Sequence, residues 1–511
     1  MRIFLVLAPV FVFLIVMLAV GFVIRKRSQK DRSVDFSKDY FIGGRSLGGF
    51  VLAMTLVATY SSGSSFVGGP GVAWLRGFGW VYLAMTQVLA AFLVMGVMGK
   101  KMAIISRKIE AVTVVDVIRT RYESNALANI GAVLIVVFFC GTMVAQFISG
   151  AQLFAAAAGI NYTLGLFVFA LVVVAFTAVG GFKAVAVTDT ICALAMLTGL
   201  GVLAYAVLDH GGGMSNIMTT IKEQPQMLEP TSGGAISVRL LISFWMLSGV
   251  CTLGLPQSLV RNMSYKSSKS LHHAMIYGTV VVGAMMLGMH LIGVLSRGVI
   301  HELPAGGTTD SIMPHLVVNY LSPIWAGIAI IAPLAAAIST VSSLLISASS
   351  SIIKDVYQHA VERKGERADQ KKVARFSIIV TAVIGVACIL VALKPPAVIV
   401  WINMFAFGGL QTAFFWTFLL GFFWKKANTT GALLSMVGGV FAYCYSMAPG
   451  IPASFKVPLY GFHAIVVGIG LGLALFVIGS LIGKPNNEKV LKLFFPETYP
   501  DGAKIEAPER I

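Results

Sequence analysis

Two long apolar segments of the sequence are interrupted in the middle by serine, glycine and proline. The first is Gly48–Trp74, broken at 61–65 and 68–71, and the second is Val238–Val260, broken at 248–249 and 254–256. In a bilayer every backbone N–H and C=O group must be paired, so an unwound stretch survives only where it is buried in protein or lines a cavity. Interrupted spans at corresponding places in two halves of a chain indicate the substrate and ion site of a transporter built from inverted repeats. The pattern therefore predicts a membrane carrier.

Composition and charge distribution support a protein that crosses the membrane many times. The 511 residues are 57% hydrophobic and only 12% charged, whereas soluble domains carry roughly 25% charged residues. The net charge of +17 could indicate nucleic acid as a partner. The Lys and Arg residues cluster in alternate loops, however, which is the positive-inside pattern of membrane proteins. We therefore expect a lipid bilayer and no nucleic acid as the partner of this surface.

Hydropathy predicts thirteen membrane spans. Their approximate ranges are 3–24, 46–74, 78–98, 126–158, 162–181, 184–208, 236–260, 271–298, 323–353, 374–393, 398–423, 430–448 and 461–483. The first is not a cleavable signal, because Ile3–Ile24 is long enough to cross a bilayer and Arg25–Arg27 follows without a small-residue cleavage site. With the N-terminus outside and the C-terminus in the cytoplasm, 31 of the 38 Lys and Arg residues fall on the cytoplasmic side.

The order of the spans predicts an all-α fold with two inverted five-helix repeats, the layout of LeuT-type transporters. The predicted units are an extra N-terminal helix (3–24), the first repeat (46–208), an outer loop (209–235), the second, inverted repeat (236–423), two C-terminal helices (430–483) and a cytoplasmic tail (484–511). Ala111–Tyr122 is expected to form a helix on the inner surface, and Asp310–Leu321 a short outer helix. The polar segments 209–235 and 484–511 are expected to be loops or disordered.

Asp189 is the one carboxylate that we predict well inside a span. A charge there costs a few kcal/mol to insert, so an acid in the membrane suggests ion coupling. The alternative is a charge near the interface that pairs locally with Lys183. In the span 323–353, Ser339 lies three to four residues from Ser342 and Ser343 on one helix face. Hydroxyl and carbonyl oxygens suit a small alkali cation, although serine also packs between membrane helices.

Uncharged polar side chains lie in other apolar spans. They are Gln87, Gln146, Asn403 and Gln411. Each could bind a substrate or join two helices. Ser62 and Ser65 lie in the first break, and together with Gln87 and Gln146 they are the residues that we expect to contact a substrate. We expect His290 to serve packing rather than proton transfer. We expect Arg261 at the inner edge of its span, so that no deep salt bridge holds a substrate.

Several stretches of the chain resemble the sodium:solute symporter family, over essentially the whole length. FIGGRSLGGFVLAM (41–54) is similar to the entry into the family's first core helix, and Ala336, Ser339 and Thr340 are similar to its sodium-site helix. GFFWKKANTTGALLSMVGGV (421–440) nearly fits the family signature, with Phe422 where an aliphatic residue is usual. GGFKAVAVTDTIC (180–192) also resembles a family segment, with Cys192 where Gln is common. The stretches 52–71, 264–275, 288–300 and 394–411 resemble members that carry pantothenate, and Tyr60 stands where proline carriers have Asp.

The resemblance implies a sodium-coupled symporter that imports a small organic anion, expected to be pantothenate, across a bacterial inner membrane by alternating access. It implies a sodium site formed by the carbonyls of Ala58 and Ser61 with Ala336, Ser339 and Thr340. Some family members hold a second sodium at positions that match Asp189, Ser342 and Ser343 here. Sodium is then the coupling ion, and the resemblance implies no other cofactor.

Other functions remain alternatives. A proton carried by Asp189 could replace sodium, and another vitamin or small carboxylate could replace pantothenate. A membrane-embedded enzyme is disfavoured, because the eight His residues form no acid–base or metal constellation within the spans. A self-contained solute sensor is disfavoured because the tail of 484–511 is too short for a signalling domain, and a channel because no filter-like loops recur.

Overall fold

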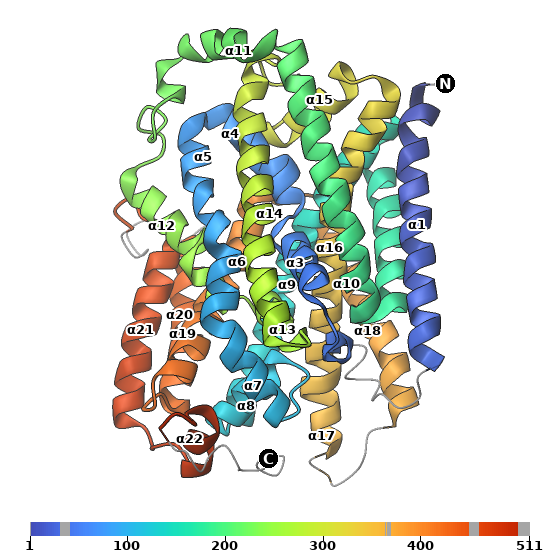
Figure 1. The fold of residues 1–511 in the computed structure, drawn as a ribbon. Helices are drawn as coiled ribbons and strands as arrows, with labels where there is room; N and C mark the ends of the chain where they lie inside the picture. Colours follow the sequence, from blue (N-terminus) through green and yellow to red (C-terminus); the bar gives the residue numbers. More distant parts are fainter. Residues whose placement is uncertain (1, 31–40, 363, 365–368, 449–458, 499–511) are drawn as a thin grey trace.

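The computed structural model describes residues 2–30, 41–362, 364, 369–448 and 459–498. The described residues form a bundle of long helices and no strand, apart from one isolated bridge between Leu47 and Tyr265 (Figure 1). The long or span-forming helices are α1 (Arg2–Lys30), α3 (Gly49–Tyr60), α4 (Gly69–Arg76), α9 (Asn125–Ala158), α10 (Tyr162–His210), α12 (Val238–Ser248), α13 (Pro256–Ser264), α14 (Ser268–Leu295), α16 (Pro323–Ser350), α18 (Gln370–Ala392), α19 (Ile399–Phe423), α20 (Thr429–Met447) and α21 (Ala464–Ile482). A further span runs through α5 (Phe78–Ala84), α6 (Ala90–Leu93) and α7 (Lys100–Lys108).

The helices account for the predicted spans. Among the described residues, ten helices are long and apolar enough to cross a membrane and the two bent helix pairs make twelve. Tyr162–Ala178 is a shorter apolar helix at the place of the remaining predicted span. Within α10 the chain crosses the bundle twice. The His210 ring lies 5.6 Å from that of Tyr320, and Tyr162 lines a pocket with Asn319 at the same end. Lys183, between them in sequence, lies against Gly43 at the other end.

Both predicted helix breaks are present. The first separates α3 from a π-helical turn at Ser64–Gly68 with a bend of 63°, and the second separates α12 from α13 with a bend of 42°. Gly68–Gly71, predicted as part of the first interruption, is instead helical. Pro70 follows the π-helical turn closely, and its missing N–H interrupts the regular α-helical hydrogen bonding there.

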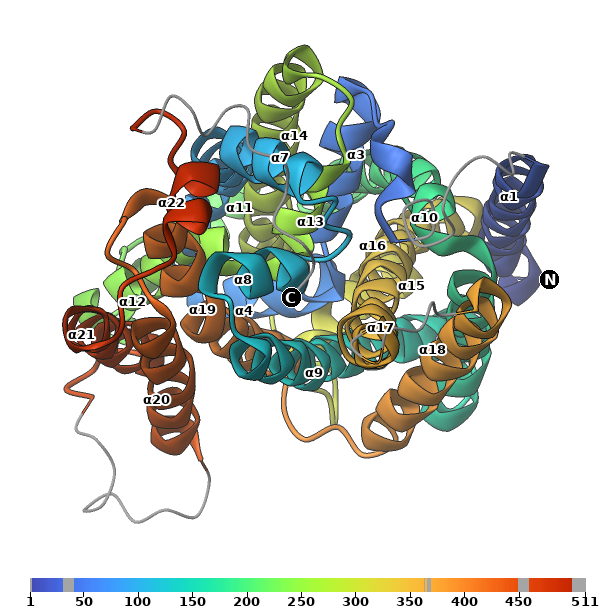
Figure 2. The ribbon, with the colours of Figure 1, turned by 90° about the horizontal axis from the view of Figure 1, so that it is seen from below.

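The two broken helices run in opposite directions, as inverted repeats require. Leu47, just before α3, donates its backbone N–H to Ser264 O at the end of α13 (3.2 Å), and Lys266 N donates to Leu47 O (3.1 Å). In the predicted division into two inverted repeats, α3 to α10 belong to the first repeat and α12 to α19 to the second. Viewed along the bundle, α13 lies near the centre, with α14 on one side and α9 on the other (Figure 2).

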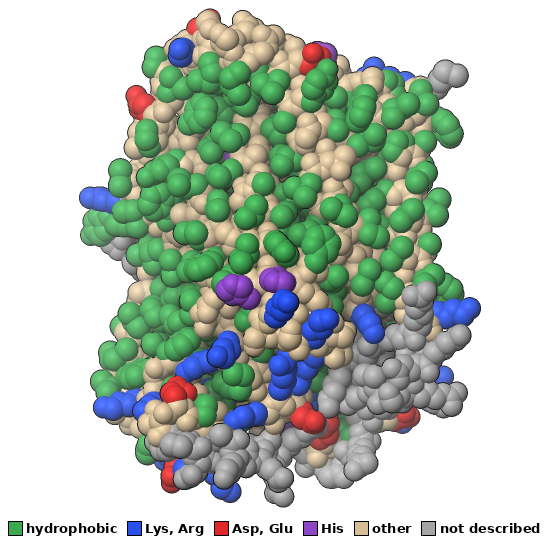
Figure 3. Space-filling view, viewed as in Figure 1, with side chains coloured by type: hydrophobic (Ala, Val, Ile, Leu, Met, Phe, Trp, Pro, Cys, Tyr) green, Lys and Arg blue, Asp and Glu red, His purple; other side chains and the backbone are tan. Residues whose placement is uncertain are grey.

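The surface matches a protein embedded in lipid. Large apolar side chains such as Phe4, Leu171 and Val280 are more than half exposed, and apolar side chains cover most of the face in Figure 3. Lys and Arg side chains gather at the end of the bundle that carries α7, α8 (Val114–Tyr122) and α22 (Glu488–Phe494).

Among the connecting segments, two predictions are confirmed and two are partly wrong. The predicted surface helix is α8, capped by Thr113 and Asp116, and the predicted short outer helix is α15 (Ile312–Tyr320). The segment 209–235, predicted to lack structure, contains α11 (Gly213–Lys222), which buries Ile217 and Ile221 one turn apart. The tail contains α22, which buries Val490, Leu493 and Phe494. In both cases a short apolar face inside a polar segment is sufficient to dock a helix. Residues 499–511 lie outside the described part.

Candidate functional site

The first helix break lies against α16. Helix α3 ends at Tyr60, and Ser61 has an extended backbone (φ −87°, ψ 121°) before the π-helical turn begins. Carbonyl oxygens at the end of α3 therefore lack the helical partners that they would have in an unbroken span. Ser339 Oγ donates a hydrogen bond to Ala58 O and Thr340 Oγ1 donates one to Ser61 O, both at 3.2 Å.

All five residues predicted to form the first sodium site are brought together here. Ser339 Oγ lies 3.1 Å from Ala336 O, and Thr340 Oγ1 lies 2.8 Å from the same oxygen. All five residues are buried. Five neutral oxygens from buried residues are the hard ligands that a small alkali cation takes, since each hydroxyl can turn its hydrogen away and offer a lone pair instead.

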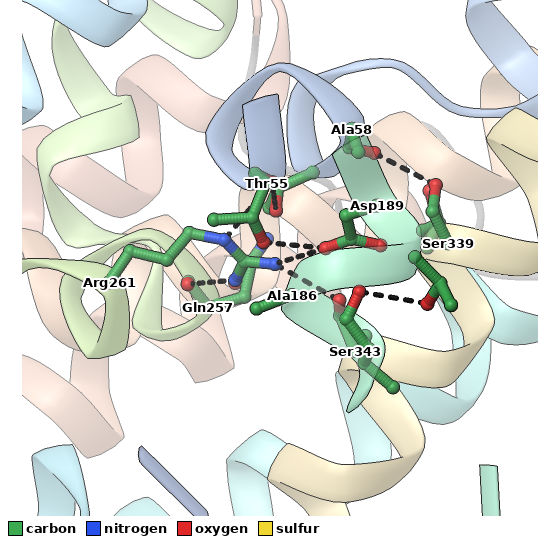
Figure 4. A network of polar contacts seen from close by, with 12 residues as sticks. Thr55, Ala58, Ala186, Asp189, Gln257, Arg261, Ser339 and Ser343 are labelled. Carbon is green, nitrogen blue, oxygen red and sulfur yellow. Dashed lines mark hydrogen bonds and ion pairs between the residues drawn. The ribbon is translucent and has the colours of Figure 1, made fainter. Parts of the chain in front are cut away.

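Asp189 is buried beside this site and pairs with Arg261 (Figure 4). Arg261 Nη2 lies 3.6 Å from Asp189 Oδ2, and each side chain is 1% exposed. Thr55 Oγ1 donates to the same carboxylate oxygen at 2.5 Å. The arginine also donates to the carbonyls of Thr55 (3.2 Å) and Gln257 (2.7 Å).

This arrangement refines one expectation and argues against one alternative. Arg261 lies in the last turn of α13, as expected, but its guanidinium turns into the protein and is buried. The buried partner of Asp189 is Arg261, from a helix distant in sequence, rather than the local Lys183. A buried charge requires such a partner.

The residues of the predicted second sodium site are only partly brought together. Arg261 Nη2 donates to Ser343 Oγ at 3.0 Å, so the guanidinium lies between Ser343 and Asp189. Ser342 Oγ accepts a hydrogen bond from Thr177 Oγ1 at 2.8 Å. Asp189 Oδ1 is buried and has no hydrogen-bond partner among the described residues.

A cavity lies between the two helix breaks. It holds ≈ 680 Å³ of space not filled by atoms, part of it open solvent. Its wall combines hydroxyl, amide and imidazole groups with apolar and aromatic side chains. The lining residues include Tyr60, Ser62, Ser64, Ser65, Gly69, Trp80, Gln87, Leu247, Ser248, Thr252, His290, Asn403 and Phe407.

Three of the four predicted substrate residues, Ser62, Ser65 and Gln87, line this cavity. Gln146 does not line it, and instead its Oε1 accepts a hydrogen bond from Gly63 N at 2.6 Å. Gln411 has a corresponding role at the second break, but as a donor: its Nε2 donates a hydrogen bond to Leu247 O at 2.7 Å. Both glutamines therefore satisfy backbone groups that the breaks leave free.

Other cavity residues were missed or undervalued by the sequence analysis. Tyr60 Oη, Ser64 Oγ and Asn403 Oδ1 are buried, line the cavity and have no hydrogen-bond partner among the described residues. His290, assigned to packing, also lines it. Ser64 and Tyr60 flank the break in the sequence, and this position was the signal that could have identified them.

Comparisons with known proteins agree with this architecture. Residues 40–439 match the model of the family described as "Sodium:solute symporter family". The chain is 41% identical to the sodium/pantothenate symporter of Escherichia coli (94% of this chain and 96% of that protein) and 42% identical to that of Haemophilus influenzae (89% and 92%). Its fold is similar to a structure of a Na⁺-coupled sialic acid symporter in a substrate-bound outward-open state, with a TM-score of 0.77, 21% identity and coverage of 95% and 99%. It is also similar to Mhp1, a nucleobase-cation-symport transporter, with a TM-score of 0.55, 14% identity and coverage of 91% and 98%.

Proposed function

The chain belongs to the sodium:solute symporter family, and we propose from this membership and from the site that it carries pantothenate into the cell together with sodium. The identity of 41–42% to two sodium/pantothenate symporters over most of both chains supports the substrate. The cavity supports it as well, because its unpaired Tyr60, Ser64 and Asn403 groups suit a small molecule rich in hydroxyl, amide and carboxylate groups.

We place the coupling sodium between the carbonyls of Ala58, Ser61 and Ala336 and the hydroxyls of Ser339 and Thr340. The observation that carries this assignment is that the two hydroxyls already contact all three carbonyls at 2.8–3.2 Å. A cation at this position joins the first broken helix to α16. Sodium then stabilises the shape of the break, and the wall of the cavity with it.

The substrate lies in the cavity against Ser62, Ser65 and Gln87. Arg261 is not among the cavity residues and is occupied by Asp189, so it does not hold the carboxylate. The N-terminus of a half-helix can hold it instead, since free backbone N–H groups and the helix dipole favour an anion there.

Coupling follows from linkage. If sodium favours the state that binds the substrate well, each ligand strengthens the binding of the other by the same factor. The sodium gradient and the membrane potential then supply the work, with the potential contributing about 2.3 kcal/mol per charge per 100 mV. We place the N-terminus outside and the C-terminus in the cytoplasm, which puts the Lys- and Arg-rich end of the bundle inside the cell.

A second sodium beside Asp189 is a separate proposal. The unpaired Asp189 Oδ1 supports it, whereas Arg261 already balances the charge of this carboxylate. If a second sodium binds, the double change Ser342→Ala and Ser343→Ala should lower the Hill coefficient of sodium-dependent uptake. An unchanged coefficient contradicts a second ion.

Uptake of radiolabelled pantothenate into proteoliposomes tests the proposed function. We expect accumulation above the external concentration under a sodium gradient, and none under a proton gradient alone. Accumulation driven by protons would favour the alternative of coupling through Asp189. Sodium-driven uptake of another carboxylate but not of pantothenate would reassign the substrate.

A further inference from the structure

His290 is a polar residue in the wall of the cavity between the broken helices. The residue lies on α14, its side chain is 4% exposed, and it lines the cavity together with Ser64 and Gly69. A residue that only fills space would need no polar atoms at this position. The hydrogen bonds of its two ring nitrogens show what it can recognise.

The position of the ring proton follows from the neighbour of Nδ1. This nitrogen lies 2.5 Å from Met286 O, one turn earlier on the same helix. A backbone carbonyl only accepts hydrogen bonds, so Nδ1 must donate. In the neutral ring Nε2 then carries a lone pair and acts as an acceptor. A neutral His290 therefore binds a hydroxyl or an amide N–H, and it disfavours a carboxylate, which also only accepts.

Nε2 lies close to the backbone of the first broken helix, at the start of α4. A Cβ atom added at Gly69 would lie 2.5 Å from Nε2, so glycine allows the ring tip to approach the start of α4 this closely. Ser64 belongs to the same turn, because its carbonyl accepts a hydrogen bond from Gly69 N. Its hydroxyl has no partner among the described residues. His290 Nε2 is thus an acceptor and Ser64 Oγ a free hydroxyl in one small region of the cavity wall. Together they suit an alcohol group, which donates one hydrogen bond and accepts others.

We propose that His290 determines substrate specificity by accepting a hydrogen bond at Nε2 from an alcohol hydroxyl of the substrate. This inference rests on the proposed function, because pantothenate carries two hydroxyls at one end and a carboxylate at the other. It orients the substrate with the hydroxyl end beside Gly69 and the carboxylate at the other side of the cavity. A substrate without this hydroxyl leaves Nε2 buried and unpaired, and sites built in this way reject such analogues.

Two substitutions separate the ring nitrogens. In His290→Gln the amide reaches the place of Nε2 and can offer an acceptor there. In His290→Asn the amide is shorter and reaches only the place of Nδ1, so it can keep the bond to Met286 O but loses the acceptor. The probes are pantothenate and its two analogues that each lack one hydroxyl, measured as sodium-driven uptake into proteoliposomes.

We expect the wild-type protein to prefer pantothenate over one of the two analogues by about 10- to 100-fold in kcat/KM. His290→Asn should lower the value for pantothenate by that factor and leave the value for that analogue nearly unchanged, so that the preference disappears. His290→Gln should retain part of the preference. A sodium-dependent rise in the thermal unfolding midpoint, measured on each preparation, verifies that the variant is folded.

The inference is overturned if His290→Asn lowers uptake of pantothenate and of both analogues by one common factor, because packing alone would do this. It is also overturned if the wild-type protein does not discriminate between pantothenate and either analogue. Absence of sodium-driven pantothenate uptake by the wild-type protein overturns the proposed function, and this inference with it. The two failures are therefore distinguishable.

Discussion

Arg261 and Asp189 form an ion pair inside the bundle, with 3.6 Å between Nη2 and Oδ2 and 1% exposure of each side chain. The pair joins α13 of the second broken helix to α10. The same guanidinium bonds to Thr55 O on the first broken helix and to Ser343 on α16. One side chain thus connects both broken helices to the helices around them, beside the proposed sodium site.

Removal of one member of this pair should destabilise the protein more than removal of both. Arg261→Gln leaves the Asp189 carboxylate without its cation, and breaking a buried pair in this way costs about 3–5 kcal/mol. The double change Asp189→Asn and Arg261→Gln leaves no net charge and should recover most of the loss. Thermal unfolding of the four proteins in detergent measures the coupling, and additive effects of the two changes would contradict it.

Removal of the Thr340 hydroxyl should weaken sodium binding. Thr340→Val keeps the shape of the side chain but deletes one of the five oxygens of the proposed site. We expect the sodium concentration for half-maximal uptake to rise about 5- to 100-fold, as for the loss of one buried polar interaction. Thr381→Val is the matched control, because Thr381 is also buried and, within the described part of the chain, bonds only to Ser377 O on α18. Equal effects of the two substitutions would disprove a specific role for Thr340.

Gln146 should act on transport through the backbone of the first break. Gln146→Leu leaves Gly63 N buried without its acceptor, a loss of about 1–3 kcal/mol. Because the sodium carbonyls lie in the same break, the apparent affinity for sodium should fall together with stability. Gln146→Glu retains an acceptor oxygen and should preserve more of both properties. If Gln146→Leu lowers the affinity for pantothenate and leaves that for sodium intact, Gln146 contacts the substrate directly after all.

Asp310 should make stability depend on pH below neutrality. Burial raises the pKa of this carboxyl to about 6, and the hydrogen bond from Ile399 N opposes the shift only in part. The folded state therefore holds the proton more tightly than the unfolded state does. This contribution to stability is fully present below about pH 4 and is lost as the pH rises through about 6.

The size of the Asp310 effect is on the order of 2–3 kcal/mol, because a pKa of about 6 lies well above the usual value of a carboxyl group. Asp310→Asn should remove this dependence, because the amide does not titrate. The thermal unfolding midpoint in detergent, compared between pH 4.5 and 7.5 for the two proteins, measures it. Parallel pH curves for wild type and Asp310→Asn would assign the dependence to other groups.

The parts of the molecule that local chemistry fixes could be predicted from the sequence. Glycine, serine and proline inside an apolar run disfavour a continuous helix, so both helix breaks could be predicted. The spacing of Ser339, Ser342 and Ser343 placed hydroxyls on one helix face, and Thr340 flanks that face. Resemblance to the family then supplied Ala58 and Ser61, the carbonyls that the hydroxyls of Ser339 and Thr340 meet.

The parts that depend on contacts between distant segments could not be predicted. Hydropathy ended the second broken span at Val260, so Arg261 was placed at its edge, whereas the partner that allows its burial is Asp189 on another helix. The role of His290 depends on Met286 O, which fixes its proton, and on the close approach of Gly69. The apolar character of the span around His290 predicts neither of these two contacts.

The most direct test of sodium coupling is the affinity of the purified protein for pantothenate, measured as a function of sodium concentration. If sodium at Ser339 and Thr340 stabilises the cavity, sodium should lower the Kd of pantothenate, and pantothenate should lower the Kd of sodium by the same factor. Thr340→Val should need more sodium for the same effect, and Thr381→Val should not. A pantothenate Kd that does not change with sodium would show that sodium binding is not coupled to substrate binding, and would contradict the proposed mechanism.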